Sequence, residues 1–159
     1  MSVAQLRIEG IIGEAEQLPG EVGSDFFSLS DFQSFLSEKE TLSADQIEVT
    51  LKSPGGNVDQ GFKMYDLVKG LQKPSRVIIE EASSIASVFA LAFDERIGAA
   101  DKFGLIHNAW IDPSNMGGYR LNQHSLAELN TEFEDADNDM LNVYVGFAGE
   151  ENRDNLLAL

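Results

Sequence analysis

Apolar residues alternate with polar ones in some segments of the chain and recur every three or four positions in others. The first pattern predicts strands and the second predicts helices. Strands are expected at residues 6–10, 47–51, 77–79, 96–99 and 103–108, and helices at 30–39, 58–71 and 85–93. Because the two kinds of segment alternate, the sequence predicts an α/β fold with mostly parallel strand pairing.

One segment near the end of the sequence carries a longer apolar pattern. Its members are Leu126, Leu129, Phe133, Ala136, Met140, Val143 and Phe147, separated by intervals of 3, 4, 3, 4, 3 and 4. This heptad-like stripe predicts one long helix. The stripe packs either along its own domain or against a second copy of the chain. We favour the second interpretation and expect self-association.

Length and composition narrow the class of protein. The 159 residues suit a single domain spanning 1–159. With 11 Lys and Arg against 27 Asp and Glu, the net charge is −16, so neither nucleic acid nor an anionic membrane surface is an expected partner. Cysteine is absent, which excludes a disulfide framework and a thiol nucleophile. No secretory leader or 18-residue apolar stretch is present, so we expect a cytoplasmic location.

A glycine-rich turn separates two of the expected elements. Residues 53–57 (Ser-Pro-Gly-Gly-Asn) follow a strand and precede a helix, so they present backbone N–H groups at a helix N-terminus. The turn lacks the glycine spacing of a dinucleotide site and the lysine of a phosphate-binding loop. What remains is an anion-stabilising corner without a fixed cation, which also describes an oxyanion hole. An ordinary β-to-α turn fits this motif equally well.

A second strand-to-helix junction carries serines, and the sequence offers few bases to activate them. Ser83 and Ser84 lie where a nucleophile suits a tight turn, although the G-x-S-x-G elbow is absent and serines there also serve as plain N-caps. His124, with Glu128 one turn on, is expected on the surface of the long helix. His107 ends an apolar strand and is the better general base.

Acidic residues of the long helix do not form a predicted metal site. Asp135, Asp137 and Asp139 match the first three ligands of a calcium-binding EF-hand loop. Met140 and Gly146 then occupy the places of its glycine and glutamate. A solvent-exposed helix face explains the three aspartates better. We therefore predict neither a metal nor an organic cofactor.

Taken in order, these motifs resemble the Clp protease proteolytic-subunit (ClpP) family, and most of all its phage-associated prohead (head maturation) proteases. The resemblance rests on the Ser-Pro-Gly-Gly turn, Gly61 in the next helix, the Ala-Ser-Ser-Ile-Ala-Ser junction at 82–87 and the Ile-His-Asn sequence at 106–108. It implies a ClpP/crotonase-like α/β fold of repeated β-β-α units with a long C-terminal helix. It also implies a serine endopeptidase that cleaves polypeptides, such as capsid or scaffold proteins, and assembles into homo-oligomeric rings. Whether an ATP-dependent unfoldase is a partner stays open.

The resemblance also implies a role for each site residue. The family's nucleophile matches Ser84, and Ser87 matches the second serine of its motif. Its general base matches His107. Its oxyanion hole is formed by backbone N–H groups that match Gly56 and Ile85. Ser83 is the rival nucleophile.

Two departures from the family pattern leave alternatives open. Glu80 replaces a glycine found in relatives, and its carboxylate would oppose an anionic intermediate unless it points away. The family's third triad member, an acid, is expected a few residues beyond Leu159, so the sequence is expected to be truncated at its C-terminus. A catalytically silent ring-forming or scaffold protein is therefore one alternative. A crotonase-type acyl-CoA enzyme, which needs no Ser–His pair, is another.

Overall fold

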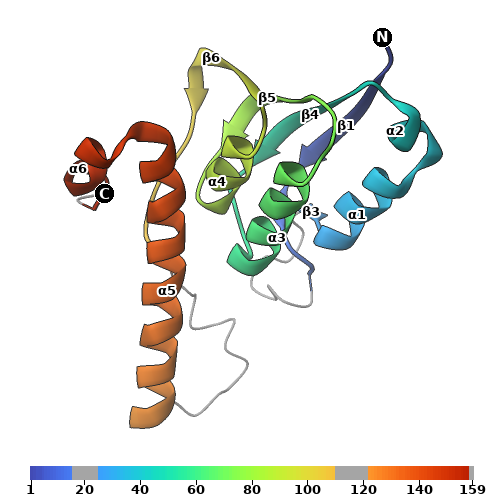
Figure 1. The fold of residues 1–159 in the computed structure, drawn as a ribbon. Coiled ribbons are helices and arrows are strands. Elements are labelled where there is room, and N and C mark those ends of the chain that lie inside the picture. The colour runs from blue at the N-terminus through green and yellow to red at the C-terminus, as the bar shows by residue number, and fades with distance from the viewer. Residues whose placement is uncertain (16–24, 110–121, 158–159) are drawn as a thin grey trace.

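The computed structural model describes residues 1–15, 25–109 and 122–157. Within these residues the main sheet contains four strands: β1 (Val3–Glu9), β4 (Gln46–Ser53), β5 (Ser75–Ala82) and β6 (Glu95–Phe103), in that spatial order. Each pairing is parallel, and Figure 1 shows the strands side by side. Two short strands, β2 (Ile11–Ile12) and β3 (Phe26–Phe27), form a separate parallel pair. The predicted α/β fold with parallel strands is therefore confirmed.

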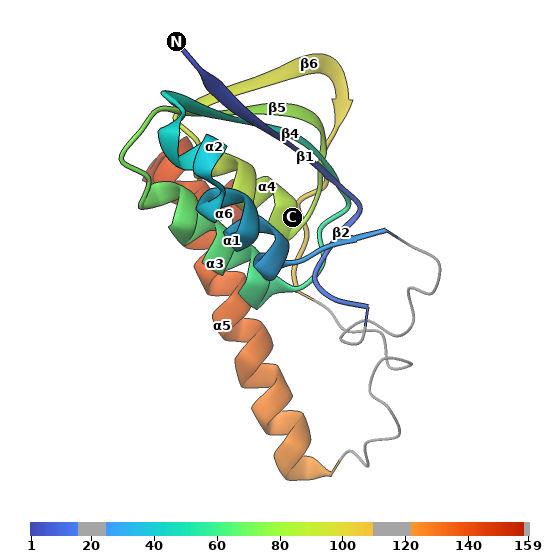
Figure 2. The same cartoon turned by 90° about the vertical axis from the view of Figure 1, so that its right-hand side faces the viewer.

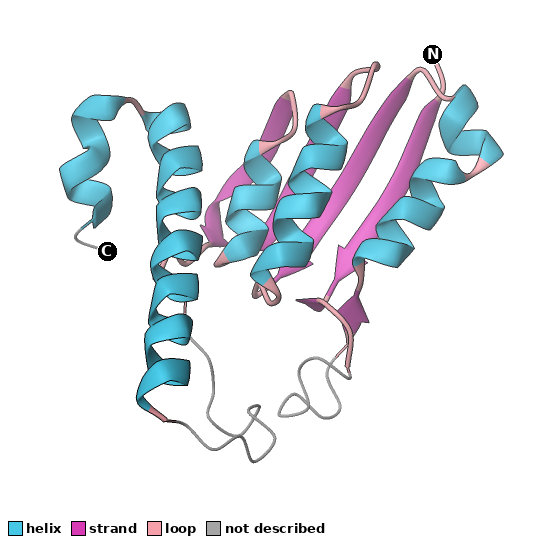
Figure 3. Ribbon diagram, turned by 60° about the horizontal axis from the view of Figure 1, so that its bottom comes forward, coloured by secondary structure: helices cyan, strands magenta, loops and turns pink. Residues whose placement is uncertain are grey.

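Helices cover one face of this sheet, as Figure 3 shows. They are α1 (Leu29–Ser37), α2 (Lys39–Ser43), α3 (Val58–Lys69) and α4 (Ile85–Leu91). The predicted long helix is confirmed as α5 (Gln123–Ala148), which packs on α4 and extends well beyond the sheet (Figures 1 and 2). A 3₁₀ turn (Glu150–Asn152) and α6 (Arg153–Leu157) follow it. No helix in the described ranges is long and apolar enough to cross a bilayer.

The core lies between the helices and the strand positions that face them. The buried apolar strand residues on that face include Ile8, Ile47, Val49, Leu51 and Val77. Three aromatic rings extend the core along the helices: the centroid of Phe89 lies 5.5 Å from that of Phe32 and 5.2 Å from that of Phe93, edge to face in both pairs. This packing fixes the carboxyl ends of β4 and β5, where both predicted site motifs begin.

The opposite face of the sheet is charged, and its charges pair across the strands. Arg7 on β1 donates two hydrogen bonds to the Glu80 carboxylate on β5, at 3.2 and 2.8 Å. Glu48 is buried, and its pKa is lowered first by Arg76 and then by a hydrogen bond from Gln5. Arg7 alternates along β1 with residues that face the core, so its side chain lies on the opposite face. Glu80 hydrogen-bonds to Arg7 and therefore also lies on the face away from α4. Its carboxylate is directed toward β1, so the first departure from the family pattern does not place a negative charge at the Ser84 junction.

One predicted boundary is wrong. The separate strands expected at 96–99 and 103–108 are a single strand, β6, and residues 104–108 follow it without strand structure. Polar residues at 101 and 102 interrupt the apolar pattern. Pairing with β5 runs from Glu95 to Gly98 and resumes at Phe103 after a register shift, so the strand extends past these positions. The pairing is made by backbone groups and does not require apolar side chains.

Candidate active site

The turn after β4 brings two glycines against the turn after β5. Gly55 and Gly56 have φ angles of 104° and 143°, which residues with a side chain rarely adopt. A β-carbon at Gly55 would lie 2.6 Å from the β-carbon of Ser84 and 3.2 Å from its Oγ. The glycine corner predicted from the sequence therefore lies directly against the predicted nucleophile, and this approach requires the missing side chain.

Ser84 precedes α4 in a strained backbone conformation. Its φ and ψ are 53° and −134°, and it is the only non-glycine residue in the described ranges with a positive φ. Such a conformation costs about 1–3 kcal/mol and persists only where its surroundings hold it. The Ser84 side chain does not cap α4, and its hydroxyl bonds to no other described residue. The hydroxyl is therefore available for chemistry, unlike that of a plain N-cap.

Hydrogen bonds pair this junction with the segment that follows β6. The Ser84 N–H donates to the carbonyl of Leu105 at 2.6 Å, and the Leu105 N–H donates to the Ser83 hydroxyl at 3.2 Å. The Ser83 N–H also donates to the carbonyl of Ser53 at 3.1 Å. Ser83 is buried and its hydroxyl is committed to the backbone, so its environment suits a structural role.

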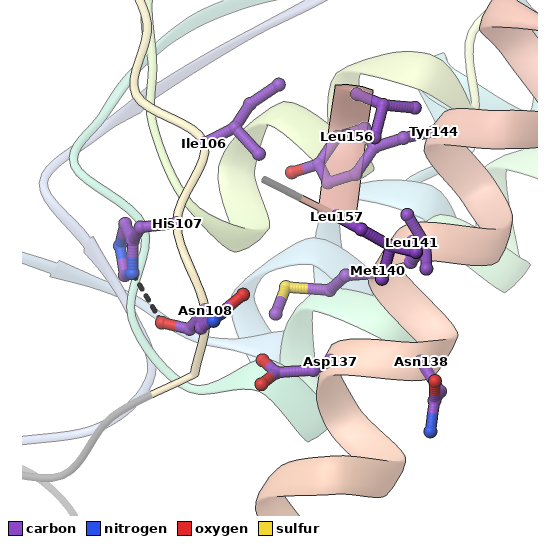
Figure 4. A pocket seen from close by; sticks show the side chains of 10 residues that line it. All are labelled: Ile106, His107, Asn108, Asp137, Asn138, Met140, Leu141, Tyr144, Leu156 and Leu157. Atoms are coloured by element: carbon purple, nitrogen blue, oxygen red, sulfur yellow. Dashed lines mark hydrogen bonds between the residues drawn. The ribbon is translucent and has the colours of Figure 1, made fainter. Parts of the chain in front are cut away.

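The same pairing brings His107, two residues after Leu105, toward the junction. Its ring Nδ1 lies 2.6 Å from the carbonyl oxygen of Asn108, as Figure 4 shows. Because a carbonyl oxygen only accepts, Nδ1 of the neutral ring carries the proton and Nε2 keeps a free lone pair. A general base needs this tautomer. In the described part of the chain no hydrogen bond joins the His107 ring to the Ser84 hydroxyl, so the two residues do not form a hydrogen-bonded catalytic pair in this conformation.

The two N–H groups matched to an oxyanion hole, those of Gly56 and Ile85, donate to no other residue within the described ranges. Gly56 is held against β2, because the Ile12 N–H donates to Gly55 at 2.8 Å and the Asn57 N–H donates to Ile12 at 2.7 Å. Ile85 begins α4, where the first N–H groups have no partner inside the helix. Both N–H groups are therefore free to bind an anion.

Helix α5 contributes two polar side chains that the sequence patterns missed. The Tyr144 hydroxyl lies 2.7 Å from the Ser87 hydroxyl, which lies 2.5 Å from the Ser84 carbonyl oxygen. Asp135 and Asp139 are exposed as predicted, whereas Asp137 is half-buried and accepts a hydrogen bond from the Ala109 N–H at 2.5 Å. Tyr144 and Asp137 lie 57 and 28 residues from these partners, a separation that no local pattern reveals. Burial raises the pKa of Tyr144, although its hydrogen bond with Ser87 opposes the rise.

A cavity of about 160 Å³ separates the His107 segment from α5 and α6 (Figure 4). Its apolar wall is formed by Ile106, Met140, Leu141, Leu156 and Leu157. Figure 4 shows the His107 ring and the α5 side chains on opposite sides of the segment that carries His107. Within the residues that the structure describes, no group of three or more His, Asp or Glu side chains is arranged to hold a metal ion.

The chain is similar to Clp proteases in sequence and in fold. Residues 25–154 match the family model described as Clp protease. No curated protein matches the chain. Among solved structures, the chain is similar to an asparagine-to-aspartate mutant of ClpP1 from Listeria monocytogenes, with a TM-score of 0.72 and 16% identity over 98% of this chain and 77% of that chain. At this identity the similarity shows the fold alone, and the ClpP-like fold expected from the motifs is confirmed.

Proposed function

The chain belongs to the Clp protease family, and we propose on this premise that it is a serine-type endopeptidase with Ser84 as nucleophile and His107 as general base. The observation that carries the proposal is a serine hydroxyl that does not cap its helix, on a strained turn beside two backbone N–H groups without a described acceptor. A strained strand-to-helix turn exposes a nucleophilic hydroxyl. Paired N–H groups stabilise the anion that forms when such a hydroxyl attacks a carbonyl.

In the proposed reaction, Ser84 Oγ attacks the carbonyl carbon of a peptide bond while His107 Nε2 takes the hydroxyl proton. The carbonyl electron pair moves onto oxygen, and the N–H groups of Gly56 and Ile85 bind the resulting anion. When the C–N bond breaks, His107 gives its proton to the leaving amine, and the acyl group stays on Ser84. Water then attacks this ester with His107 as base, which releases the new carboxylate and restores the serine.

The His107 ring must approach Ser84 for this reaction to begin. The Asn108 carbonyl holds the proton on Nδ1, so Nε2 is already in the form that accepts the serine proton. We expect the Nε2–Oγ hydrogen bond to close when a substrate binds, because catalytic hydrogen bonds commonly tighten in the substrate complex.

For the substrate, we propose polypeptides of a phage capsid or its scaffold. The support is the order of the motifs, which most resembles the phage-associated prohead proteases. A capsid or scaffold polypeptide should then be cleaved faster than an unrelated unfolded protein such as casein. Equal rates on both would contradict this substrate class and leave the peptidase proposal intact.

A fluorophosphonate tests the proposed nucleophile directly, because it forms a covalent adduct with an activated serine hydroxyl. We expect one adduct per chain, located at Ser84 by mass spectrometry of the digested protein. An adduct at Ser83 or Ser87 would reassign the nucleophile, and no adduct at all would contradict the peptidase proposal.

The second candidate is a catalytically silent ring-forming or scaffold protein. It is favoured by one observation: no hydrogen bond joins the Ser84 hydroxyl to the His107 ring in the described part of the chain. The paired N–H groups would also suit a crotonase-type enzyme, which stabilises an enolate and needs no serine. Labelling at Ser84 argues against both alternatives, because neither activates the serine.

We also propose that the protein self-associates through α5, in keeping with the ring assembly that the family resemblance implies. Leu126 and Phe147 are 52% and 60% exposed, and Leu129 and Phe133 between them are only half-buried. Met140 is the one member of the seven-residue stripe that is buried by its own domain. Figure 1 shows the N-terminal half of α5 projecting beyond the sheet, so this part of the stripe is open to a second copy.

Sedimentation velocity tests this association. The wild-type protein should sediment as a species larger than 17.4 kDa, and higher ionic strength should favour assembly by screening the net charge of −16. Leu126→Lys should shift the protein toward the monomer, because it places a charge in the apolar contact. Gln123→Lys, at an exposed polar position of the same helix, is the matched control. A wild-type protein that stays monomeric at all micromolar concentrations would contradict the proposal.

A further inference from the structure

The side chains of Ser87 on α4 and Tyr144 on α5 form a hydrogen-bond network with the Ser84 carbonyl. Ser87 donates to this carbonyl from its hydroxyl at 2.5 Å and from its backbone N–H at 2.9 Å. The Tyr144 hydroxyl on α5 lies 2.7 Å from the Ser87 hydroxyl and 3.5 Å from the same carbonyl oxygen. Tyr144 is only 8% exposed, so water has little access to this network.

The acceptor at the end of the network sets its direction of donation. The Ser84 carbonyl can only accept, so the Ser87 hydroxyl donates to it and the Ser87 oxygen accepts from Tyr144. A tyrosine phenol is ordinarily protonated at neutral pH, and burial raises the pKa of Tyr144 further. Each hydrogen bond in such a chain strengthens the next, so the carbonyl is held firmly in one orientation.

That carbonyl belongs to the same peptide group as the Ile85 N–H. The described part of the chain contains no cis peptide bond, and the carbonyl and N–H of a planar trans peptide group point in opposite directions. A carbonyl directed toward Ser87 and Tyr144 therefore aims the Ile85 N–H away from them. On that side the N–H meets no acceptor from another described residue.

We propose that Tyr144 and Ser87 are positioning residues for the oxyanion hole: by fixing the peptide plane between Ser84 and Ile85, they aim the Ile85 N–H at the substrate oxyanion. This inference rests on the proposed peptidase function. It gives α5 a part in the site itself, in addition to its proposed part in assembly.

The proposal is tested by Tyr144→Phe, which keeps the buried ring and removes only the hydroxyl. We expect kcat for a fluorogenic peptide and the rate constant of fluorophosphonate labelling to fall about tenfold, with KM near the wild-type value. Removing an oxyanion donor outright costs about 10²–10³ in kcat, and here the donor remains but is less well aimed. Ser87→Ala should cause a similar loss, and Ser87→Thr, which keeps a hydroxyl, should restore most of the activity.

The double variant separates positioning from general damage to the fold. Tyr144→Phe combined with Ser87→Ala should lose no more than the worse single variant, because both act on one carbonyl. Tyr65→Phe, which removes a hydroxyl from half-buried Tyr65 on α3, should leave kcat unchanged. If Tyr144→Phe does not fold, as judged by circular dichroism, the comparison of Ser87→Ala with Ser87→Thr decides the question.

Three outcomes would overturn the inference. One is additive losses in the double variant, and another is a rise in KM with unchanged kcat. The third is a wild-type protein that reacts with the fluorophosphonate and a Tyr144→Phe variant that reacts equally fast. That outcome would leave the peptidase proposal standing. A wild-type protein that does not react with the fluorophosphonate would instead overturn the proposed function itself, and the positioning role with it.

Discussion

Ser84→Ala will reduce peptide hydrolysis by a factor on the order of 10⁴ or more while the protein remains folded. Serine peptidases that lose their nucleophile keep only the small rate enhancement that the oxyanion hole and substrate binding supply. The Ser84 hydroxyl bonds to no other described residue, so its removal breaks no structural contact there. Alanine keeps the β-carbon, so the backbone strain at φ 53° is the same in both proteins. Turnover of a fluorogenic peptide and the urea midpoint of unfolding should be measured on the same preparations.

Ser83→Ala is the matched control for this variant. It removes a hydroxyl from the adjacent residue, but that hydroxyl accepts a hydrogen bond from Leu105 and is buried. We expect it to lower the free energy of unfolding by about 1 kcal/mol, the usual net value of one hydrogen bond, and to affect turnover far less than Ser84→Ala. Equal losses of turnover from the two substitutions would mean that the nucleophile has been misassigned.

The strands that carry the core were predictable because burial on one face imposes a period of two. Val49 and Leu51 alternate with polar residues in the sequence, and both are buried in β4. The edge strand β6 was divided in two by the same reasoning. Its Ile97 and Gly98 are exposed although both pair with β5, so strand structure here does not follow burial. Apolar alternation is therefore a weaker guide at the edge of a sheet than at its centre.

The two turns of the site were predictable because the residues that favour a turn lie within the turn itself. Adjacent glycines after a strand indicate a turn with positive φ, and Gly55 and Gly56 have such angles. The assignment of Ser84 over Ser83 came only from the family resemblance. The structure supplies a physical difference between them: the Ser83 hydroxyl is used by the backbone, whereas the Ser84 hydroxyl does not cap its helix.

The part of α5 in the site was not predictable from its apolar stripe. Of the seven stripe residues only Met140 is buried, whereas the other buried residues of α5, Tyr144 and Val145, lie outside the stripe. A tyrosine beside an apolar stripe gives no signal of its own, since its role depends on Ser87, which belongs to another helix. Asp137 was misplaced because charge on a helix usually indicates solvent, but its partner is a backbone N–H. Both contacts arise from tertiary packing that a helical period does not encode.

Gly55→Ala should damage both the stability and the activity of the protein. The new methyl group would lie 2.6 Å from the β-carbon of Ser84 and 2.9 Å from the Ser83 carbonyl oxygen, and alanine would be strained at a φ of 104°. Overpacking and strain each cost about 1–3 kcal/mol. We therefore expect the free energy of unfolding to fall by about 2–6 kcal/mol, measured by urea titration.

The activity loss should exceed what this loss of stability explains. Relief of the clash pushes Ser84 away from the free N–H groups, and a displacement near 1 Å at a reacting group costs about 10² in rate. Peptide turnover should therefore fall about a hundredfold or more per folded molecule, below the melting temperature of the variant. Gly146→Ala is the control, because nothing lies within 4 Å of its new methyl group in α5. This variant should gain about 0.5–1 kcal/mol, as alanine does over glycine inside a helix, and keep its turnover. If folded Gly55→Ala also kept its turnover, the approach of Gly55 to Ser84 would be a packing contact with no part in placing the nucleophile.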